Sequence, residues 1–368
     1  MAGNDQAYMA RALELARKGV YSTHPNPRVG CVIVRDGQVV GEGWHVRAGE
    51  PHAEVHALRQ AGERARGATA YVTLEPCSHH GRTPPCADAL VASGVGRVVA
   101  AMQDPNPQVA GRGLQRLADA GIAVASGVLE AEARALNPGF IKRMEQGLPF
   151  VRVKLAMSLD GRTAMASGES QWITGPAARS AVQRLRARAS LVLTGADTVL
   201  TDAARLTVRG DELGLDPELT ALAVSRPPLR VLVDGRLRVP ASAPFFQAGP
   251  ALVATALEGR NAHPGHELLA LPGADGHVDL RRLLLKLAER GANEVLVEAG
   301  PRLAGAFARE GLVDEYQIFI AGKFLGSSAR PLLDWPLERM AEAPELTIVE
   351  IRAVGDDWRV IAVPRVPA

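Results

Sequence analysis

The chain lacks the features of a secreted or membrane protein. Its 368 residues include only three cysteines, too few for a disulfide framework. No apolar run approaches the roughly 20 residues that span a bilayer, and residues 1–10 lack the apolar core of a signal peptide. The formal net charge is only +2, which indicates no general affinity for nucleic acid or membranes. These absences predict a cytoplasmic protein with neither nucleic acid nor a membrane as partner.

The length and composition suit two globular domains. In residues 1–148, helical and strand periodicities alternate, which predicts a three-layer α/β/α domain. Its expected helices cover residues 5–18, 52–60, 87–92 and 111–120, and its expected strands cover residues 29–34, 38–41, 68–74, 96–101 and 122–125.

Residues 149–368 are predicted to form a second α/β domain. We expect residues 346–351 and 358–363 to pair as antiparallel strands, and residues 212–228 and 259–276 to be surface loops. The other expected strands cover 151–156, 191–194, 229–233, 251–254, 294–297 and 315–321, and the expected helices cover 177–189, 280–290 and 301–309.

The first domain contains the residue pattern of a hydrolytic zinc site, which comprises His52-Ala53-Glu54, Pro76-Cys77 and Pro85-Cys86. One imidazole and two thiolates fill three of zinc's four positions and leave the fourth for water. Glu54 is placed to move protons between that water and a departing amine. The pattern is typical of zinc-dependent nucleobase deaminases, although eight residues separate the two cysteines where two are usual.

A structural zinc site is the less favoured alternative, with Glu54 as a surface carboxylate. Structural sites usually have four protein ligands, and the third cysteine, Cys31, lies in an apolar stretch typical of a core strand. His79 and His80 lie between the two metal-binding cysteines and remain alternative ligands. Substrate contact is the more natural role for them, because Arg82 is adjacent.

Long motifs over nearly the whole chain closely resemble the bifunctional riboflavin-biosynthesis deaminase–reductase family. They include Gly-Arg-Thr-Pro-Pro between the two cysteines, so the long spacing is that family's own form. In the second half, the sequence Leu-Thr-Val-Arg ends at Arg209. Together the motifs cover residues 23–31, 49–57, 75–86, 154–162, 168–174, 206–209 and 297–305.

The resemblance implies a cytidine-deaminase-like domain followed by a dihydrofolate-reductase-like domain, with Zn²⁺ and NADPH as cofactors. The implied substrates are small phosphorylated pyrimidines. The first domain would deaminate 2,5-diamino-6-(5-phosphoribosylamino)pyrimidin-4-one, and the second would reduce the ribosyl group of 5-amino-6-(5-phosphoribosylamino)uracil to ribityl. We also expect a homo-oligomer.

The resemblance also assigns binding residues. For the deaminase substrate they are Asn26, His45, His79 and Arg82. For the reductase substrate they are Lys154, Ser170, Arg186, Leu206, Arg209 and Glu298. For NADPH they are Ala156, Trp172, Thr198, Asp202, Gly300, Pro301, Arg302, Leu303, Ala304, Gly305 and Ala306. The sequence departs from the family's Asp-Asp-Pro at Asp202-Ala203-Ala204, which leaves the local turn open.

Elementary chemistry also supports the reductase interpretation. Gly300-Pro301 follows an apolar strand and opens a helix, whose amides can hold a phosphate, and arginine forks match phosphate oxygens. No G-x-G-x-x-G follows the first strand, so a Rossmann site is not indicated. The competing interpretations are a nucleic-acid base deaminase with an accessory domain, which the near-neutral charge disfavours, and a non-catalytic zinc-stabilised binding module, which Glu54 disfavours.

Overall fold

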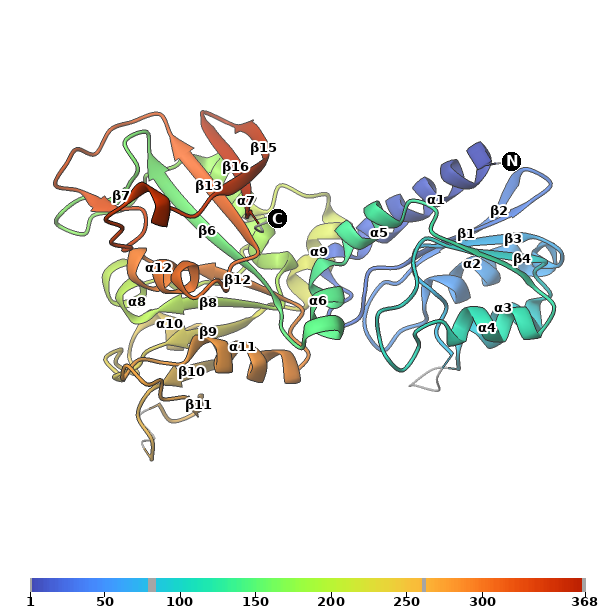
Figure 1. The fold of residues 1–368 in the computed structure, drawn as a ribbon, viewed down its shortest axis with the longest axis horizontal. Helices are drawn as coiled ribbons and strands as arrows, with labels where there is room; N and C mark the ends of the chain where they lie inside the picture. The colour runs from blue at the N-terminus through green and yellow to red at the C-terminus, as the bar shows by residue number, and fades with distance from the viewer. Residues whose placement is uncertain (1, 79–83, 260–262, 366–368) are drawn as a thin grey trace. The chain divides into compact units, whose positions relative to one another are not determined.

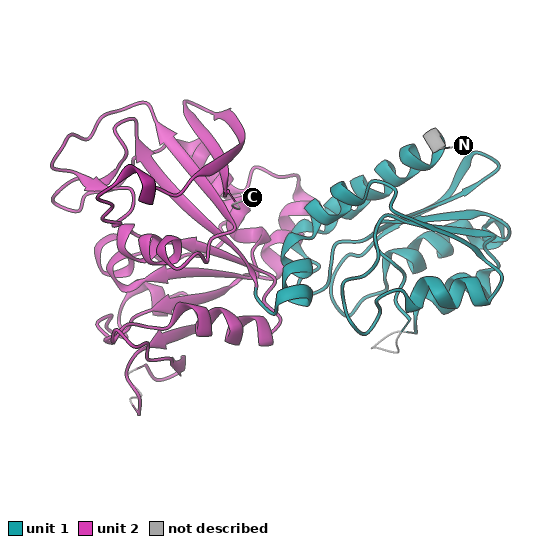
Figure 2. Ribbon diagram, viewed as in Figure 1, with its two compact units in different colours: residues 1–148 teal, residues 149–368 magenta. Residues whose placement is uncertain are grey.

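Two compact units make up the chain, Met1–Leu148 and Pro149–Ala368 (Figure 2). A computed structural model describes residues 2–78, 84–259 and 263–365. Each unit contains its own sheet with helices packed against it (Figure 1). No helix within these described ranges is long and apolar enough to cross a membrane.

Unit 1 is built on a five-stranded sheet in the order β2-β1-β3-β4-β5. The β1–β2 hairpin turns at Asp36 and Gly37, whose φ angles of 51° and 77° suit a two-residue turn. The strands are β1 (Gly30–Arg35), β2 (Gln38–Trp44), β3 (Thr69–Val72), β4 (Arg97–Ala100) and β5 (Ala123–Ser126). The helices are α1 (Ala2–Arg17), α2 (Ala53–Ala61), α3 (Cys86–Ser93), α4 (Arg112–Asp119), α5 (Glu130–Leu136) and α6 (Pro138–Gln146), with 3-10 turns η1 (Lys18–Tyr21) and η2 (Gly62–Ala65).

Both faces of this sheet are covered, because successive side chains of a strand point to opposite sides. Cys31 and Ile33 of β1 pack with α2, α3 and α4 in one apolar cluster. Val32 and Val34 pack with α1, α5 and α6 in the other. The predicted three-layer arrangement follows from this alternation.

Unit 2 is built on a nine-stranded sheet in the order β11-β10-β9-β8-β12-β6-β13-β16-β15. All neighbours from β11 to β13 are parallel, and β16 and β15 add an antiparallel edge. Its strands are β6 (Phe150–Ser158), β8 (Leu191–Gly195), β9 (Leu229–Val233), β10 (Ala251–Thr255), β11 (Glu267–Ala270), β12 (Glu294–Glu298), β13 (Glu315–Ala321), β15 (Leu346–Val354) and β16 (Asp357–Pro364). A separate pair comprises β7 (Arg162–Ala164) and β14 (Arg330–Pro331).

The helices of unit 2 follow the crossovers that parallel strands require. Helices α7, α8 and α10 pack against the sheet in one apolar cluster, which includes Leu185, Phe245 and Phe319. The helices are α7 (Pro176–Arg188), α8 (Ala196–Asp202), α9 (Pro217–Ser225), α10 (Pro244–Gln247), α11 (Leu280–Glu289) and α12 (Pro301–Arg309), with 3-10 turns η3 (Gly210–Glu212) and η4 (Met340–Glu342).

Two stretches predicted as loops contain regular structure, so that prediction was wrong in part. Residues 212–228 contain α9, which begins where the Asp216 side chain accepts a hydrogen bond from Leu219 N at 2.9 Å and Pro217 takes the first helical position. Residues 259–276 contain the short parallel strand β11, which is too short and too exposed to leave a periodic pattern.

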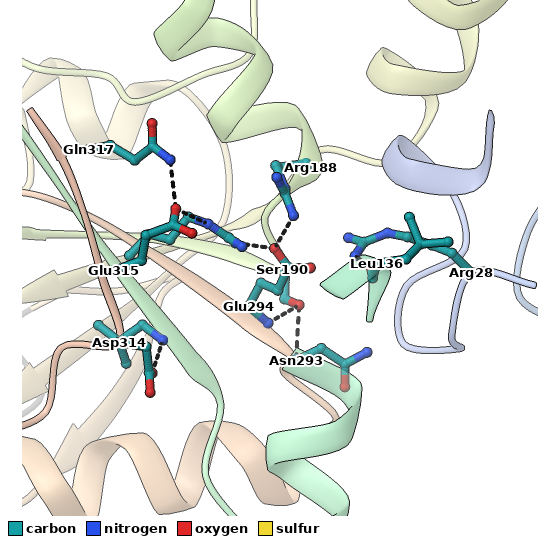
Figure 3. Close-up of polar contacts among 11 residues, drawn as sticks. Arg28, Leu136, Arg188, Ser190, Asn293, Glu294, Asp314, Glu315 and Gln317 are labelled. Carbon is teal, nitrogen blue, oxygen red and sulfur yellow. Dashed lines mark hydrogen bonds and ion pairs between the residues drawn. The ribbon is translucent and has the colours of Figure 1, made fainter. Parts of the chain in front are cut away.

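A network of buried charges joins the beginnings of the central strands of unit 2 (Figure 3). Arg152 on β6 is paired with Glu294 on β12 and with Glu315 on β13, and Arg188 also pairs with Glu294. Gln317 donates to Glu315 at 2.6 Å. Removing one partner of such a network would leave a buried charge uncompensated, so each member is needed for the stability of these strand ends.

Candidate active sites

Three donor atoms converge at one end of the sheet in unit 1. His52 is the N-cap of α2, Cys77 follows β3 and Cys86 is the first residue of α3. His52 Nδ1 lies 3.3 Å from Cys86 Sγ and 3.7 Å from Cys77 Sγ, and all three donor atoms lie within 4.8 Å of one another. A tetrahedral zinc ion requires sulfur–nitrogen separations of about 3.5 Å. The donor set therefore fits Zn²⁺.

The two thiols are unequal. Hydrogen bonds from the Cys86 thiol and from His52 hold the pKa of Cys77 below its ordinary value, against the effect of burial, and Cys86 N also donates to Cys77 Sγ at 3.3 Å. The pKa of Cys86 is raised by its bond to Cys77 and by burial. Cys77 is therefore the thiolate that this pocket favours first.

Glu54 is buried beside these donors in the first turn of α2, at 3% exposure. Burial raises the pKa of its carboxyl above the ordinary value. Its Oε2 has no hydrogen-bond partner among the described residues. A buried carboxylate oxygen without a partner is costly for stability, and here it is available to exchange protons with a bound molecule.

The half-buried Asn26 and the buried His45 form a pair next to His52. The Asn26 amide nitrogen donates to His45 Nε2 at 3.0 Å, so His45 Nδ1 carries the proton and donates to Pro51 O at 3.2 Å. Burial lowers the pKa of His45 to about 4. Its ring packs edge-on against His52, with centroids 5.1 Å apart. His79 and Arg82, which were also predicted to contact substrate, lie outside the described residues.

Unit 2 contains a cavity of about 1900 Å³ at the carboxyl ends of β6, β8 and β12. Open parallel sheets bind ligands at this edge. Most of the predicted reductase residues line it: Lys154, Ala156, Ser170, Trp172, Arg186, Thr198, Asp202, Leu206, Arg209, Glu298, Gly300, Pro301, Arg302, Leu303 and Ala306.

Two residues of the predicted phosphate-binding turn do not line this cavity. Ala304 is fully buried, and Gly305 is buried where a Cβ atom would lie 2.5 Å from Asp334 O. Helical periodicity accounts for this, since these positions face inward from α12 while Arg302, Leu303 and Ala306 face the cavity.

A buried ion pair forms part of the cavity wall. Arg186 Nε and Nη2 donate to the two oxygens of Glu298 at 2.5 and 2.9 Å. Burial opposes the charge of Glu298, but Arg186 prevails and lowers its pKa. Desolvation lowers the pKa of the neighbouring Lys154 amine. Arg209 is more exposed and is paired with Glu212 at 2.8 Å.

The first turn of α12 is held at its cavity end by α8. Gly300 N donates to Thr198 Oγ1 at 3.1 Å, and Ser170 Oγ donates to Asp202 Oδ1 at 2.8 Å. The departure at Asp202-Ala203-Ala204 is accommodated at the end of α8, where Ala203 takes a φ of 50°. Asp202 therefore keeps a defined position without the proline of the family's pattern.

Sequence reasoning missed a group of charges on the same cavity. Arg236 and Arg238 line it just beyond the end of β9, and Asp197 on α8 lies between Arg238 at 2.8 Å and Arg302 at 3.4 Å. The available signal was two arginines directly after the carboxyl end of an apolar strand, where parallel sheets place ligands.

Comparison with known proteins agrees with these two sites. The model of the cytidine and deoxycytidylate deaminase zinc-binding region matches residues 2–102, and that of the RibD C-terminal domain matches residues 149–360. The chain thus combines a zinc-dependent deaminase with a reductase. It is 57% identical over 359 residues to the riboflavin biosynthesis protein RibD of Escherichia coli, covering 96% of this chain and 97% of that protein.

Solved structures extend the likeness to the whole fold. Acinetobacter baumannii RibD, form 1, superposes with a TM-score of 0.91 at 48% identity, covering 99% of this chain and all of that one. The Thermotoga maritima deaminase/reductase superposes with a TM-score of 0.87 at 34% identity, covering 99% of each chain. The chain belongs to the RibD family of bifunctional riboflavin-biosynthesis enzymes.

Family membership confirms the expected fold class, both activities, and the use of Zn²⁺ and NADPH on phosphorylated pyrimidine substrates. It also decides against the two competing interpretations, a nucleic-acid base deaminase and a non-catalytic zinc module.

Proposed function

We propose that His52, Cys77 and Cys86 hold the zinc ion and that Glu54 is the proton carrier of the deaminase. The observation that carries this proposal is the unpartnered Glu54 Oε2, buried beside three converging donors. When bound, zinc lowers the pKa of a water to about 7. Glu54 takes a proton from the attacking water and returns it to the amine as it departs, so that a carbonyl replaces the amine and ammonia is released.

Zinc content tests the ligand assignment. Cys77→Ser and Cys86→Ser should reduce bound zinc to well below one ion per chain, since a hydroxyl is a poor soft ligand. The matched control is Cys31→Ser, which changes a fully buried core cysteine and should leave zinc content unchanged. Full zinc occupancy in either ligand variant would reject the assignment.

We propose 2,5-diamino-6-(5-phosphoribosylamino)pyrimidin-4-one as the deaminase substrate, held by Asn26, His45, His79 and Arg82. The neutral ring of His45 supports this, because a ring kept neutral by burial can exchange its Asn26 contact for one with an uncharged base. Arg82 is assigned to the phosphate, so Arg82→Ala should raise the substrate's KM while zinc stays bound. An unchanged KM would move phosphate binding elsewhere.

In unit 2 we assign the sugar of 5-amino-6-(5-phosphoribosylamino)uracil to Glu298 and its phosphate to Arg209, whereas the sequence led us to expect Arg186 as a second phosphate ligand. Arg186 is engaged by Glu298 on two nitrogens, which supports a role in aligning that carboxylate next to the substrate. Lys154 adds charge near the reacting sugar, and Ser170 and Leu206 complete the substrate pocket. NADPH, when bound, supplies the hydride that reduces the ribosyl group to ribityl.

For NADPH we assign Ala156, Trp172, Thr198, Asp202 and the cavity-lining residues of the turn that begins α12, which are Gly300, Pro301, Arg302, Leu303 and Ala306. The N–H groups at the start of α12 suit the pyrophosphate. Arg236, Arg238 and Arg302 lie on the same cavity, where Asp197 pairs with Arg238 and Arg302, and this surplus of guanidinium groups suits the additional phosphate that distinguishes NADPH from NADH.

We further assign deamination to residues 1–148 and reduction to residues 149–368. Each unit contains its own sheet and its own polar site. A fragment from Pro149 to Ala368 should oxidise NADPH with the deaminated substrate and ignore the aminated precursor. A folded fragment that does not bind NADPH would contradict this division.

For the oligomer we propose a homodimer that forms through strand β15. This strand ends the nine-stranded sheet, and Ile348, Val349 and Ile351 are 57–61% exposed on it. Long apolar edge strands invite pairing with another chain. Ile351→Lys should lower the mass measured by sedimentation to that of a monomer, whereas Val39→Lys on the exposed edge strand β2 should not.

We propose the cytoplasm as the compartment, because the free thiols of Cys77 and Cys86 must stay reduced to bind metal. Cell fractionation with an antibody to the untagged protein tests this, and recovery in an extracytoplasmic fraction would contradict it.

A further inference from the structure

Glu75 caps a helix from another part of unit 1. Its Oε2 accepts hydrogen bonds from the backbone N–H groups of Asp104 (3.0 Å) and Gly111 (2.9 Å). Its Oε1 accepts from those of Gly113 (2.8 Å) and Leu114 (3.2 Å), in the first turn of α4. The carboxylate is 3% exposed, and all four bonds come from main-chain amides. Such amides compensate the charge of a buried carboxylate.

Helix α4 depends on this carboxylate for its start. Its N-cap residue is Gly111, which has no side chain to accept the first amides of the helix. Glu75 supplies that acceptor from 36 to 39 positions earlier in the chain. The backbone N–H of Glu75 donates to Met102 O at 3.0 Å. Hydrogen bonds therefore hold both the main chain and the side chain of Glu75.

Direct packing also joins α4 to the segment that carries Cys77. A Cβ atom on Gly113 would lie 1.9 Å from Pro76 O, so the helix backbone touches the peptide next to the cysteine. Arg116, on the same helix, contacts Ser78 O at 3.5 Å and Asp88 on α3 at 2.5 Å. Helix α4 thus contacts both the Cys77 segment and α3, the helix that Cys86 begins.

We propose that Glu75 is a positioning residue for the zinc site: by clamping α4 against Pro76, it fixes Cys77 Sγ at the distance from Cys86 and His52 that the metal requires. The proposal rests on the zinc ligands assigned above. In the structure, Cys77 Sγ accepts from Cys86 N at 3.3 Å and Cys77 O accepts from Ala87 N at 3.2 Å. Cys77 therefore lies between α3 on one side and the Glu75 clamp on the other.

Replacing Glu75 should have different effects if it is purely a structural cap and if it is a positioning residue. A cap affects only the free energy of unfolding. A positioning residue also changes the affinity for the metal and the ligand field around it, because residues that orient metal ligands typically influence affinity about 10- to 100-fold. Metal affinity and ligand-field spectra therefore separate the two roles, without an activity assay.

The first experiment compares Glu75→Gln with Asp5→Asn in the full-length protein. The amide keeps one acceptor and places an NH₂ group against two N–H donors. Asp5→Asn is the matched control, because it disrupts the polar contacts of Asp5 with Tyr71 and Arg97 on the other face of the same sheet. Competition with a chromogenic chelator should give Glu75→Gln a zinc dissociation constant about 10- to 100-fold above wild type, with shifted absorption bands after cobalt substitution. Asp5→Asn should change neither.

Equal zinc affinity and an unchanged cobalt spectrum in Glu75→Gln would overturn the proposal and leave Glu75 as a structural cap. Cys77→Ser keeps this outcome distinct from failure of the ligand assignment. If Cys77→Ser retains zinc, the zinc site itself is misassigned. If Cys77→Ser loses zinc while Glu75→Gln binds it normally, only the positioning role fails.

A second measurement needs no variant and applies even if Glu75→Gln does not fold. Coupling between two sites is reciprocal, so removing zinc from the wild-type chain should loosen the clamp. Hydrogen exchange at the amides of Asp104, Gly111, Gly113 and Leu114 should speed up about 10- to 100-fold when zinc is chelated. The amide of Ile33 in the sheet serves as the reference. Unchanged exchange at the four amides would overturn the proposal.

Discussion

The two sites of this chain are built in opposite ways. The deaminase site consists of a few buried groups on neighbouring segments: His52, Glu54, Cys77 and Cys86 all lie within 35 positions of one another. The reductase cavity has a volume of about 1900 Å³ and is lined by residues from Lys154 to Asp334. One site is defined by the chemistry of its atoms, and the other by the shape and charge that several strand ends provide together.

The difference follows from what each ligand demands. A zinc ion accepts few donor types at narrow distances, so short motifs with fixed residues are enough to specify it. A dinucleotide and a phosphorylated sugar are large, and they contact backbone amides and apolar surface as well as side chains. Many residue types can supply such contacts, so the corresponding positions carry little signal one at a time.

The largest effect that we expect comes from Glu54→Gln. The amide keeps the shape of the side chain and removes the proton acceptor, so deamination should fall about 10²–10⁴-fold while bound zinc stays at one per chain. NADPH oxidation with the deaminated substrate should be unchanged. Following ammonia release and NADPH oxidation in one assay tests both statements, and normal deamination by this variant would remove Glu54 from the mechanism.

Glu298→Gln is the corresponding test in the reductase cavity. It removes the carboxylate that pairs directly with Arg186 while Lys154 lies close by, and breaking a buried pair costs about 3–5 kcal/mol. Denaturant unfolding of unit 2 should show this loss of stability. The variant should also bind the reductase substrate more weakly and deaminate normally. Glu212→Gln, which breaks the exposed pair with Arg209, should cost at most about 1 kcal/mol. Equal losses in the two variants would show that burial of the Glu298 pair is energetically unimportant.

Much of unit 1 could be predicted because local signals agree with tertiary packing. Val29–Val34 alternates into two apolar clusters, and a buried strand is found there at Gly30–Arg35. The expected helix at residues 52–60 begins one residue later, with His52 as its N-cap. The role of Glu75 could not be predicted from the sequence, because its four amide partners lie 29 to 39 positions away.

Unit 2 required the family resemblance to interpret its residues. Arg186 and Glu298 look like independent charges in the sequence, and only the fold brings them into a bidentate pair across 112 positions. Ala304 and Gly305 belong to the predicted phosphate-binding turn but face away from the cavity. Arg236 and Arg238 match no motif and were missed. Parallel strands gather distant residues in this way, so spacing along the chain says little about which of them meet.

The buried carboxyl group of Asp104 in unit 1 should make the stability of the protein depend on pH. Burial raises the pKa of Asp104 from 3.8 to about 6, so the folded protein holds this proton more tightly than the unfolded chain. The resulting stabilisation is complete below pH 3.8 and is lost as pH rises through about 6, by about 3 kcal/mol in total. Asp104→Asn can still accept from Asn106 N and should remove this dependence. The variant should thus be about as stable as wild type at acidic pH and more stable at pH 8. Parallel stability curves for the two proteins would contradict the shift.

The smallest effect that we expect distinguishes the two nicotinamide cofactors. Arg238 is 47% exposed and is paired with Asp197, so Arg238→Ala should leave the fold intact and weaken NADPH binding about tenfold, the equivalent of one charge-assisted hydrogen bond of about 1.4 kcal/mol. NADH has no phosphate on its adenosine ribose, so its affinity should not change. Asp197→Asn should act in the opposite direction, because it frees Arg238 and Arg302 from a competing acid and should tighten NADPH binding. Fluorescence titration of both cofactors against the two variants measures these changes. If Arg238→Ala weakens NADPH and NADH equally, the additional phosphate is bound elsewhere on the cavity. The reductase cavity would then select its cofactor through groups other than the arginines beyond β9.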